Sequence, residues 1–460
     1  MTAVSVRYGH SVSFAEALRV WARVAALSFG GPAGQIAVMH RILVEEKRWI
    51  GESRFLHALN YCMLLPGPEA MQLATYIGWL LHGVRGGLGA GTLFVLPGFV
   101  SILVLSILYA GFQDLPLVQA VFFGIKAAVL AVVIDALLRI GKRTLKTAPM
   151  YLIAAAAFVA IFVFDVPFPI IIAAAALAGF LGGRADPASF FVIKGHDAPT
   201  GEAPEADPLL AAGGSAHVQP SWRRTIRTAG VWFGLWFAPI LALMILAGPN
   251  DVFTRLAVFF SKLAVVTFGG AYAVLAYMAQ EAVQTHGWLS PGEMLDGLGM
   301  AETTPGPLIQ VTQFVGYMTG YREAGGLHPV LAGTLASVIV TWVTFVPCFL
   351  WIFLGAPFIE KLRGNVLLSA ALSAVTAAVV GVILNLAVWF ALHVAFGELS
   401  EVRGWGARLL IPDPETIDWA VIVIAAGALV AMRFKAGMLP VLLVSAVIGA
   451  MYYLSAPALF

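Results

Sequence analysis

The chain has 460 residues, of which 60% are hydrophobic and only 11% are charged. A soluble domain carries roughly a quarter charged residues, so this composition excludes a soluble enzyme and indicates a protein whose solvent is lipid. The formal net charge of +2 argues against a nucleic-acid partner. The two cysteines, Cys62 and Cys348, lie in apolar stretches, so neither a disulfide framework nor a metal site or cofactor is expected.

Apolar runs of roughly 17–25 residues, long enough to cross a bilayer as helices, follow one another along the chain. In the first part they are expected at about 17–43, 55–81, 88–111, 116–139, 149–165 and 167–183. A single span is expected at about 228–248, and a second series at about 255–282, 294–319, 328–354, 366–396, 417–433 and 438–455. The sequence therefore predicts an all-α integral membrane protein with about 13 spans.

Two copies of one pattern are visible in the chain. Phe29-Gly30-Gly31 recurs as Phe268-Gly269-Gly270, and Pro66-Gly67-Pro68 recurs as Pro305-Gly306-Pro307, both at a shift of 239 residues (268 − 29). Four regions are expected: an N-terminal repeat (1–183), a flexible cytoplasmic linker rich in Pro, Gly and charge (184–222), a connecting helix (223–250) and a C-terminal repeat (251–460). Six spans and one connecting span precede the second copy, and because this number is odd the second copy has the opposite orientation in the membrane. This arrangement is typical of secondary transporters with inverted repeats.

Arg and Lys residues indicate the orientation, because cytoplasmic loops of membrane proteins are enriched in them. With 13 crossings, one side receives the clusters at 139–146, 223–227 and 361–363, which places the N-terminus in the cytoplasm and the C-terminus outside. If both Pro-Gly-Pro segments were re-entrant hairpins, the clusters at 139–146 and 361–363 would fall on opposite sides. The prediction is therefore 13 crossings.

The Gly-Gly and Pro-Gly-Pro segments interrupt apolar runs, and such breaks are tolerated in lipid only inside protein or beside a water-filled cavity. Pro32, Pro68 and Pro307 can each start a new half-helix, where proline is well placed. The free N–H groups and the positive dipole end of a half-helix form a site for an anion such as a tetrahedral oxyanion. The alternative is that these residues only allow close packing or kinks.

Ionisable residues within apolar runs are candidates for function. Glu69 follows Pro68 and Glu302 precedes Pro305 by three residues, so each carboxylate is a candidate for proton coupling or, alternatively, a helix cap. Lys126 is a candidate cationic ligand or a residue that extends its amine to the membrane surface. The candidate substrate-binding residues are Phe29, Gly30, Gly31, Pro32, Gln35, Pro66, Gly67, Pro68, Glu69, Gln72, Lys126, Phe268, Gly269, Gly270, Thr304, Pro305, Gly306, Pro307 and Gln310.

The segments SFGGPAGQIAVMHRILVEEKRWI (28–50) and LLPGPEAMQLATYIGW (64–79) closely resemble the signatures of the chromate ion transporter family. The second copy, with TFGGAYAVLAYMAQEAVQTHGWLS (267–290) and TTPGPLIQVTQFVGY (303–317), resembles the C-terminal half of that family's long two-domain form. This resemblance implies a multi-pass carrier of the inner membrane that exports chromate, uses the proton gradient and confers chromate resistance.

One alternative to chromate export stays open. Sulfate is a tetrahedral dianion of similar size, so a transporter or channel for sulfate or another oxyanion fits the same pattern. A membrane-embedded enzyme would need clustered carboxylates or metal ligands at a membrane face, and the sequence contains no such constellation, so an enzyme is not expected. The expected partners are the oxyanion and the lipid bilayer, and formation of a homodimer stays open.

Overall fold

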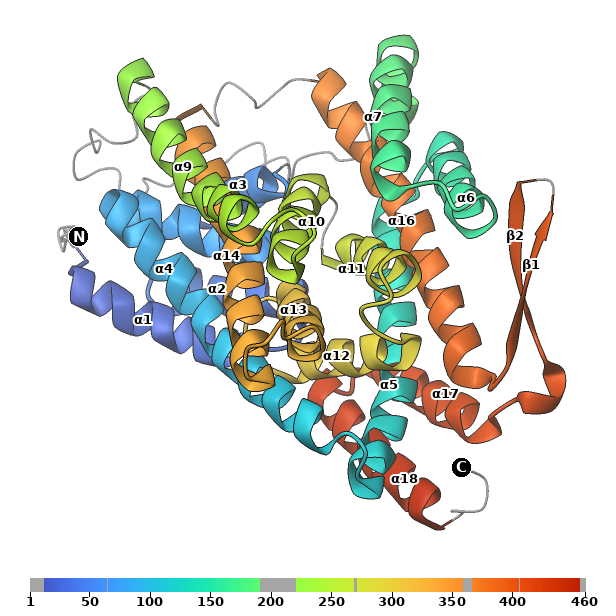
Figure 1. The fold of residues 1–460 in the computed structure, drawn as a ribbon. Coiled ribbons are helices and arrows are strands. Elements are labelled where there is room, and N and C mark those ends of the chain that lie inside the picture. The colour runs from blue at the N-terminus through green and yellow to red at the C-terminus, as the bar shows by residue number, and fades with distance from the viewer. Residues whose placement is uncertain are drawn as a thin grey trace, which may run out of the picture.

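The computed structural model describes residues 12–63, 65–190, 221–268, 271–358, 366–404 and 406–455, and nearly all of them are helical (Figure 1). The elements of the first repeat are α1 (Phe14–Leu27), α2 (Gly31–His40), η1 (Arg41–Glu46), α3 (Glu52–Cys62), α4 (Glu69–Phe112), α5 (Pro116–Thr144), α6 (Ala148–Phe162), α7 (Phe168–Ala185) and the short α8 (Pro187–Phe190). Residues 191–220 of the expected linker lie outside the described residues.

The connecting helix is α9 (Trp222–Leu246). The elements of the second repeat are α10 (Val252–Val266), α11 (Ala271–Ala279), η2 (Gln280–Thr285), α12 (Pro291–Thr303), η3 (Leu308–Gln310), α13 (Val311–Arg322), α14 (Pro329–Gly355), η4 (Ala356–Phe358), α16 (Val366–Ala395), β1 (Leu399–Gly404), β2 (Ala407–Pro412), η5 (Pro414–Thr416), α17 (Trp419–Arg433) and α18 (Met438–Ser455). The labels η1 and η2 denote π-helical turns, and the other η labels denote 3₁₀ turns.

Seven of the described helices are long and apolar enough to cross a membrane, and the chain is a multi-pass membrane protein. They are α4, α5, α7, α9, α14, most of α16, and α18. Two shorter helices, α6 and α17, are also apolar. Helix α4 is really two helices, because His82 (φ −137°) and Gly83 (φ +60°) leave the helical conformation and form a kink.

The interrupted segments of the second repeat form helical hairpins whose outer ends lie together. Arg255, near the start of α10, lies 3.4 Å from Glu323, just after α13, and its guanidinium lies over the ring of Trp288 at 5.7 Å. Arg322, the last residue of α13, donates to the carbonyl of Trp288 and forms an ion pair with Glu293. Thus α10 and α11 form one hairpin, α12 and α13 form another, and both open at the same end.

The first repeat has the same design. Lys47, just after η1, lies 3.2 Å from Glu16 near the start of α1, so the first segment also turns back. His82, at the end of the first part of α4, bonds to the carbonyl of Val12 at 2.8 Å and contacts the ring of Phe14. The second segment therefore returns to the side from which α1 begins.

These contacts do not confirm the expectation of about 13 spans, which required every interrupted segment to cross the bilayer. The physical reason is local: Gly30 and Gly31 have φ angles of +85° and +69°, and Gly67 and Gly306 have φ angles of +125° and +102°. Only glycine adopts such angles readily. At these positions the chain reverses direction and forms a hairpin, whereas the expectation was a kink in a continuous span.

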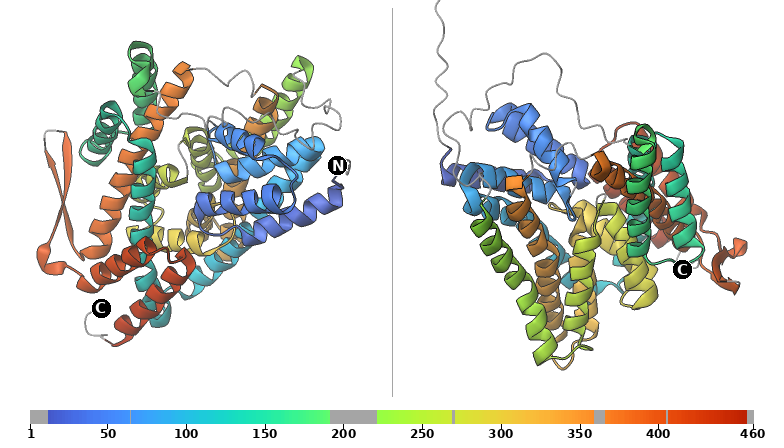
Figure 2. Two further views of the ribbon diagram at one scale, coloured as in Figure 1. Left: turned by 180° about the vertical axis from the view of Figure 1, so that it is seen from behind. Right: turned by 90° about the horizontal axis from the view of Figure 1, so that it is seen from above.

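The helices form two bundles (Figures 1 and 2). The hairpin bundle contains α1–α4 and α9–α14, and the scaffold bundle contains α5–α7 and α16–α18. In the scaffold bundle, small residues allow helices of the two repeats to approach closely. Gly124 of α5 packs on Gly449 of α18, and Gly179 of α7 packs on Ala374 of α16. Small residues at helix interfaces are a common means of association in lipid.

A two-stranded antiparallel hairpin, β1–β2, connects α16 to α17 and pairs Leu399 with Pro412. The first repeat has only residues 145–147 at the corresponding place, between α5 and α6. The hairpin extends along the outside of the scaffold bundle (Figure 1), where Arg408 donates its backbone N–H to the carbonyl of Val163 at 2.6 Å.

Candidate functional site

The tips of the hairpins meet in two reciprocal contacts. The N–H of Gly67, in the first Pro-Gly-Pro, donates to the carbonyl of Thr267 at 2.9 Å. The N–H of Gly306, in the second Pro-Gly-Pro, donates to the carbonyl of Ser28 at 3.0 Å. Thr267 is the counterpart of Ser28 at the shift of 239, so each Pro-Gly-Pro tip pairs with the other repeat's Phe-Gly-Gly tip. This exchange joins the two repeats at one centre.

The glycines at this centre are constrained in conformation and in space. A Cβ atom on Gly67 would lie 2.8 Å from Nε2 of Gln72 and 3.0 Å from Sγ of Cys348, and one on Gly306 would lie 2.8 Å from Oε1 of Gln310. Gly98 of α4 packs so closely on the second tip that its Cβ would meet the same glutamine. The two tips are therefore held by helices of opposite repeats, α14 for the first tip and α4 for the second.

Three buried glutamines from the predicted site surround the tips. Gln35 donates to the carbonyl of Gly306 at 2.6 Å, Gln72 to the carbonyl of Pro66 at 2.7 Å, and Gln310 to the carbonyl of Val95 at 3.0 Å. Gln35 and Gln72 therefore bind backbone carbonyls of the Pro-Gly-Pro tips, whereas Gln310 binds a carbonyl within α4. The oxygens Oε1 of Gln72 and Gln310 are buried without a hydrogen-bond partner among the described residues.

Helices begin at the tips as the sequence predicts. Helix α2 begins at Gly31 with Pro32 in its first turn, which confirms the role expected for this proline. Pro68 and Pro307 are the residues immediately before α4 and η3, one position earlier than expected. The first N–H groups of α2 and α4 have no partner within their own helices, so the positive ends of both helices lie at the tips.

Glu302 is a buried carboxylate beside this centre. It is buried in α12, and its Oε1 accepts a hydrogen bond from the hydroxyl of Tyr272 at 2.8 Å. Its Oε2 has no partner among the described residues and lies 4.0 Å from the place where a Cβ on Gly31 would be. The carboxylate of the second repeat thus faces the glycine break of the first.

A second buried carboxylate, Asp296, was not among the sequence predictions. It lies on α12 two turns before Glu302, and its Oδ2 accepts a hydrogen bond from Tyr109 at 2.7 Å and lies 3.4 Å from Nζ of Lys126. The structure therefore places Lys126 near the outer start of α12, away from the tips. The signal for Asp296 was present in the sequence, because it is an acidic residue inside the run MLDGLGM (294–300).

The remaining predicted residues lie around the same tips. Phe29 and Phe268 are half-buried beside the two Gly-Gly breaks, and Thr304 is the buried residue that ends α12. Glu69 is the first residue of α4. Pro305 belongs to the second tip, whereas Gly269 and Gly270 lie outside the described residues.

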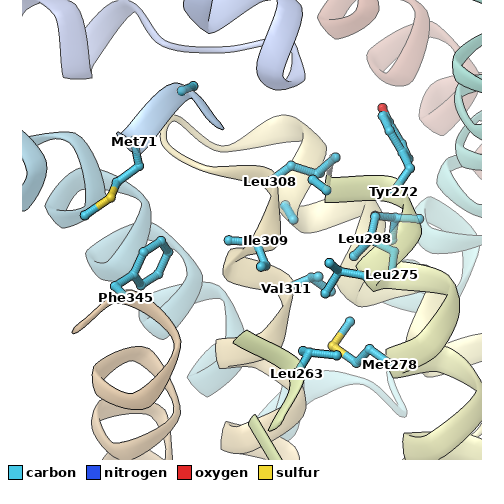
Figure 3. Close-up of a cluster of buried hydrophobic side chains, with 14 of the residues drawn as sticks. Met71, Leu263, Tyr272, Leu275, Met278, Leu298, Leu308, Ile309, Val311 and Phe345 are labelled. Atoms are coloured by element: carbon cyan, nitrogen blue, oxygen red, sulfur yellow. The ribbon is translucent and has the colours of Figure 1, made fainter. Parts of the chain in front are cut away.

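An apolar cluster supports the tips from within the hairpin bundle (Figure 3). Leu308 and Ile309, which follow the second tip, lie between Met71 of α4 on one side and Tyr272 and Leu298 on the other. Both leucine and isoleucine are almost fully buried. Dense apolar packing on several sides fixes the position of the tip backbone.

The sequence was compared with known protein families and proteins. The family model described as chromate transporter matches residues 15–180 and 254–450, which together include both pairs of hairpins. A chromate transport protein of Pseudomonas aeruginosa is 33% identical over 362 residues, which are 78% of this chain and 76% of that protein. A chromate transport protein of Cupriavidus metallidurans is 28% identical over 379 residues, which are 82% of this chain and 83% of that protein.

A protein named probable chromate transport protein from Synechococcus elongatus is 26% identical over 415 residues, which are 88% of this chain and 92% of that protein. No solved structure matches the chain. The similarity to transport proteins therefore covers both repeats and both halves of the tip region.

Proposed function

Because the chain belongs to the chromate transporter family, we propose that it exports chromate across the inner membrane in exchange for protons and thereby confers chromate resistance. The observation that carries this proposal is the reciprocal pairing of the four tips, with a buried carboxylate, Glu302, beside them. Backbone N–H groups and helix N-termini suit a tetrahedral dianion, and a carboxylate suits a proton.

In the proposed orientation the two repeats are inverted. Five apolar helices separate the first pair of hairpins from the second: the part of α4 after its kink, α5, α6, α7 and α9. If each crosses the membrane, the odd number places the two pairs on opposite sides. The four helices that follow the second pair of hairpins, α14, α16, α17 and α18, do not enter this argument, since it depends only on the helices between the pairs.

The distribution of basic residues supports this orientation. On the side where α1 begins lie Lys47, Arg48, Arg85, Lys142, Arg143, Lys146, Arg184, Arg223, Arg224, Arg227, Arg433 and Lys435, and on the side where α10 begins lie Arg255, Arg322, Arg403 and Arg408. Cytoplasmic loops are the basic ones, so the N-terminal hairpins enter from the cytoplasm. With hairpins at every break, the clusters at 139–146 and 223–227 lie on the same side in this orientation, and the cluster at 361–363 lies outside the described residues.

The proposed transport cycle follows from how the bundles meet. The scaffold helices α5 and α16 pack against α11 and α12 of the second repeat, whereas α2 and α3 of the first repeat make none of the larger contacts with the scaffold among the described residues. Inverted repeats can exchange such one-sided packing. This conformation is then closed toward the periplasm and accessible from the cytoplasm, and the alternative packing would open the tips outward.

Glu302 is the proposed proton carrier. It is buried at the tips, contacts Tyr272, and comes from a hairpin that the scaffold covers in this conformation. A carboxylate that binds a proton on one side and releases it on the other can couple proton entry to anion exit. Glu69, at the start of α4, is the corresponding candidate in the first repeat.

The experiment that tests this function is chromate uptake by inverted membrane vesicles that contain the protein, with and without a proton gradient and with sulfate as competitor. Accumulation that needs the gradient and resists sulfate is the expected result for a chromate exporter. Sulfate accumulation in place of chromate would assign the same site to sulfate. Vesicles that contain the protein and accumulate neither anion would contradict the proposal.

A further inference from the structure

A polar cavity of about 250 Å³ lies under the β1–β2 hairpin. None of its lining residues belongs to the tips of the helical hairpins. Its walls come from four places: β1 and β2, the end of α16, the turn between α6 and α7, and η2 with the start of α12. The residues that give it chemical character are Asp165, Gln284, His393, Glu401, Arg403 and Arg408. The first repeat has no counterpart to the hairpin, so this cavity is a feature of one side of the molecule.

Arg408 is the central cation of the cavity. Only 8% of the residue is exposed, and it is held from both sides: its backbone N–H bonds to Val163, and its Nη1 donates to Oε1 of Gln284 at 3.0 Å. Its Nε is buried without a hydrogen-bond partner among the described residues. A guanidinium in the wall of a cavity can bind an oxyanion through its N–H groups.

The negative groups of the cavity are already compensated. Asp165 lies 3.7 Å from Arg408 and accepts a hydrogen bond from Gln280 at 2.7 Å, and Glu401 lies 2.5 Å from Nε of Arg403. Each carboxylate in the wall thus has a polar or cationic neighbour. An entering dianion meets no unpaired negative charge there.

A smaller pocket lies beside the cavity. It is lined by Arg408, Gln280, Gln284, Ala276 and Asn385, and it shares Arg408 and Gln284 with the cavity. Tyr272 and Ala276 of α11 and Gln280, the first residue of η2, follow at intervals of four residues, which puts them on one face. At the end of that face, the hydroxyl of Tyr272 bonds to Glu302.

We propose that this cavity is an oxyanion-binding vestibule at the periplasmic mouth of the transport path, with Arg408 as its anion ligand. The proposal rests on the proposed function for its direction and for its link to the tips. The bonds from Arg408 to Gln284 and from Gln280 to Asp165 join the hairpin bundle to the scaffold bundle on this side. An anion that takes over a donor of Arg408 weakens this closure, so that binding at the mouth favours its opening.

The direct test measures protection of a cysteine in the cavity wall. Thr285 lines the cavity, and both native cysteines are buried, so Thr285→Cys can be labelled with a membrane-impermeant maleimide in right-side-out vesicles. Sulfate and molybdate, which do not oxidise thiols, serve as probes. We expect either anion to slow labelling several-fold. Glu415→Cys, exposed on the same side but outside the cavity, should be labelled at an unchanged rate.

Arg408 is tested by Arg408→Gln and Arg408→Lys in the Thr285→Cys background. The glutamine variant should lose the protection, and the lysine variant should keep it at a higher anion concentration because a positive charge remains. Labelling that neither anion slows, or protection that is the same in Arg408→Gln, would overturn the vestibule. The lysine variant also guards against misfolding, since it preserves the charge and most of the side-chain volume.

A transport measurement separates this proposal from the proposed function. A hydrogen bond to a charged group contributes about 1.5–3 kcal/mol, so Arg408→Gln should raise about tenfold or more the external chromate concentration that half-saturates chromate exchange in right-side-out vesicles. Arg433→Gln removes an exposed charge at the other end of the scaffold and should leave this concentration unchanged. If the unmodified protein moves no chromate but anions still protect Thr285→Cys, the proposed function fails and the vestibule stands.

Discussion

The two repeats share a backbone design but differ in side-chain chemistry. Their tips exchange equivalent hydrogen bonds, Gly67 to Thr267 and Gly306 to Ser28. In the second repeat, α12 carries two buried carboxylates, Asp296 and Glu302. At the shift of 239 their counterparts in the first repeat are His57 and Met63, and neither is a carboxylic acid.

This difference separates two requirements of the molecule. Reciprocal pairing at the tips needs the same backbone conformation in both copies, so the glycines and prolines recur. Charge movement needs ionisable groups at one place only, so the copies can diverge there. The predictions that follow test this division, first where the repeats differ and then where they agree.

The largest expected effect is the loss of proton coupling in Glu302→Gln. The variant should fail to accumulate chromate with a proton gradient, because its amide cannot release a proton, yet it should still exchange chromate for chromate. Uptake and exchange in vesicles measure the two activities separately. Tyr272→Phe, which removes only the hydrogen bond to Glu302, should keep gradient-driven uptake at a reduced rate. Full gradient-driven uptake by Glu302→Gln would contradict the assigned role.

The next largest expected effect comes from removing the ion pair between Lys126 and Asp296. Removal of one partner leaves a buried charge uncompensated and should lower the free energy of unfolding by about 3 kcal/mol in Lys126→Met. The double variant Lys126→Met/Asp296→Leu should recover part of this loss, with a coupling energy of about 0.5–3 kcal/mol. Thermal unfolding of the purified variants measures both quantities. Additive effects of the two single changes would show that the residues act independently.

Gly67→Ala and Gly306→Ala test where the repeats agree. Both glycines have positive φ angles and close neighbours, so each alanine should destabilise the protein by about 1–3 kcal/mol, and the two losses should be similar. Gly111→Ala is the matched control, since a Cβ there meets no atom within 4 Å and the residue is helical. Unequal losses of unfolding free energy at the two tips would contradict their structural equivalence.

The smallest expected effect comes from the glutamine that only the first repeat possesses. Gln35→Leu removes the hydrogen bond to the carbonyl of Gly306 and should cost about 1 kcal/mol in unfolding free energy. The counterpart in the second repeat is Val274, which makes no such bond because its side chain is apolar. A loss far above that of Gln72→Leu, which also breaks one side-chain bond to a carbonyl, would contradict the single hydrogen bond assigned to Gln35.

The sequence predicts the helices, the two copies and the half-helix starts, because apolar length, the shift of 239 and proline position are local signals. It does not decide whether an interrupted segment crosses or returns. That outcome depends on contacts between residues far apart, such as Arg255 with Glu323, and on glycine torsions that a kink and a turn both permit.

The candidate site was predicted in part for the same reason. The tips and Glu302 stand out because breaks and buried acids are visible in the sequence. Asp296 gives the same signal, yet its importance depends on Lys126 and Tyr109, which are 170 and 187 residues away (296 − 126 and 296 − 109). The β1–β2 hairpin and Arg408 fall between two expected spans, where an apolar-run search finds nothing.

The central claim is that the two repeats enter the membrane from opposite sides as hairpins. The most direct test is labelling of Glu46→Cys and Thr285→Cys, exposed counterparts at the shift of 239, with an impermeant maleimide. The account predicts that Glu46→Cys reacts only in inverted vesicles and Thr285→Cys only in right-side-out vesicles. The reverse result would restore 13 crossings, and reaction of both from one side would show that the repeats are not inverted.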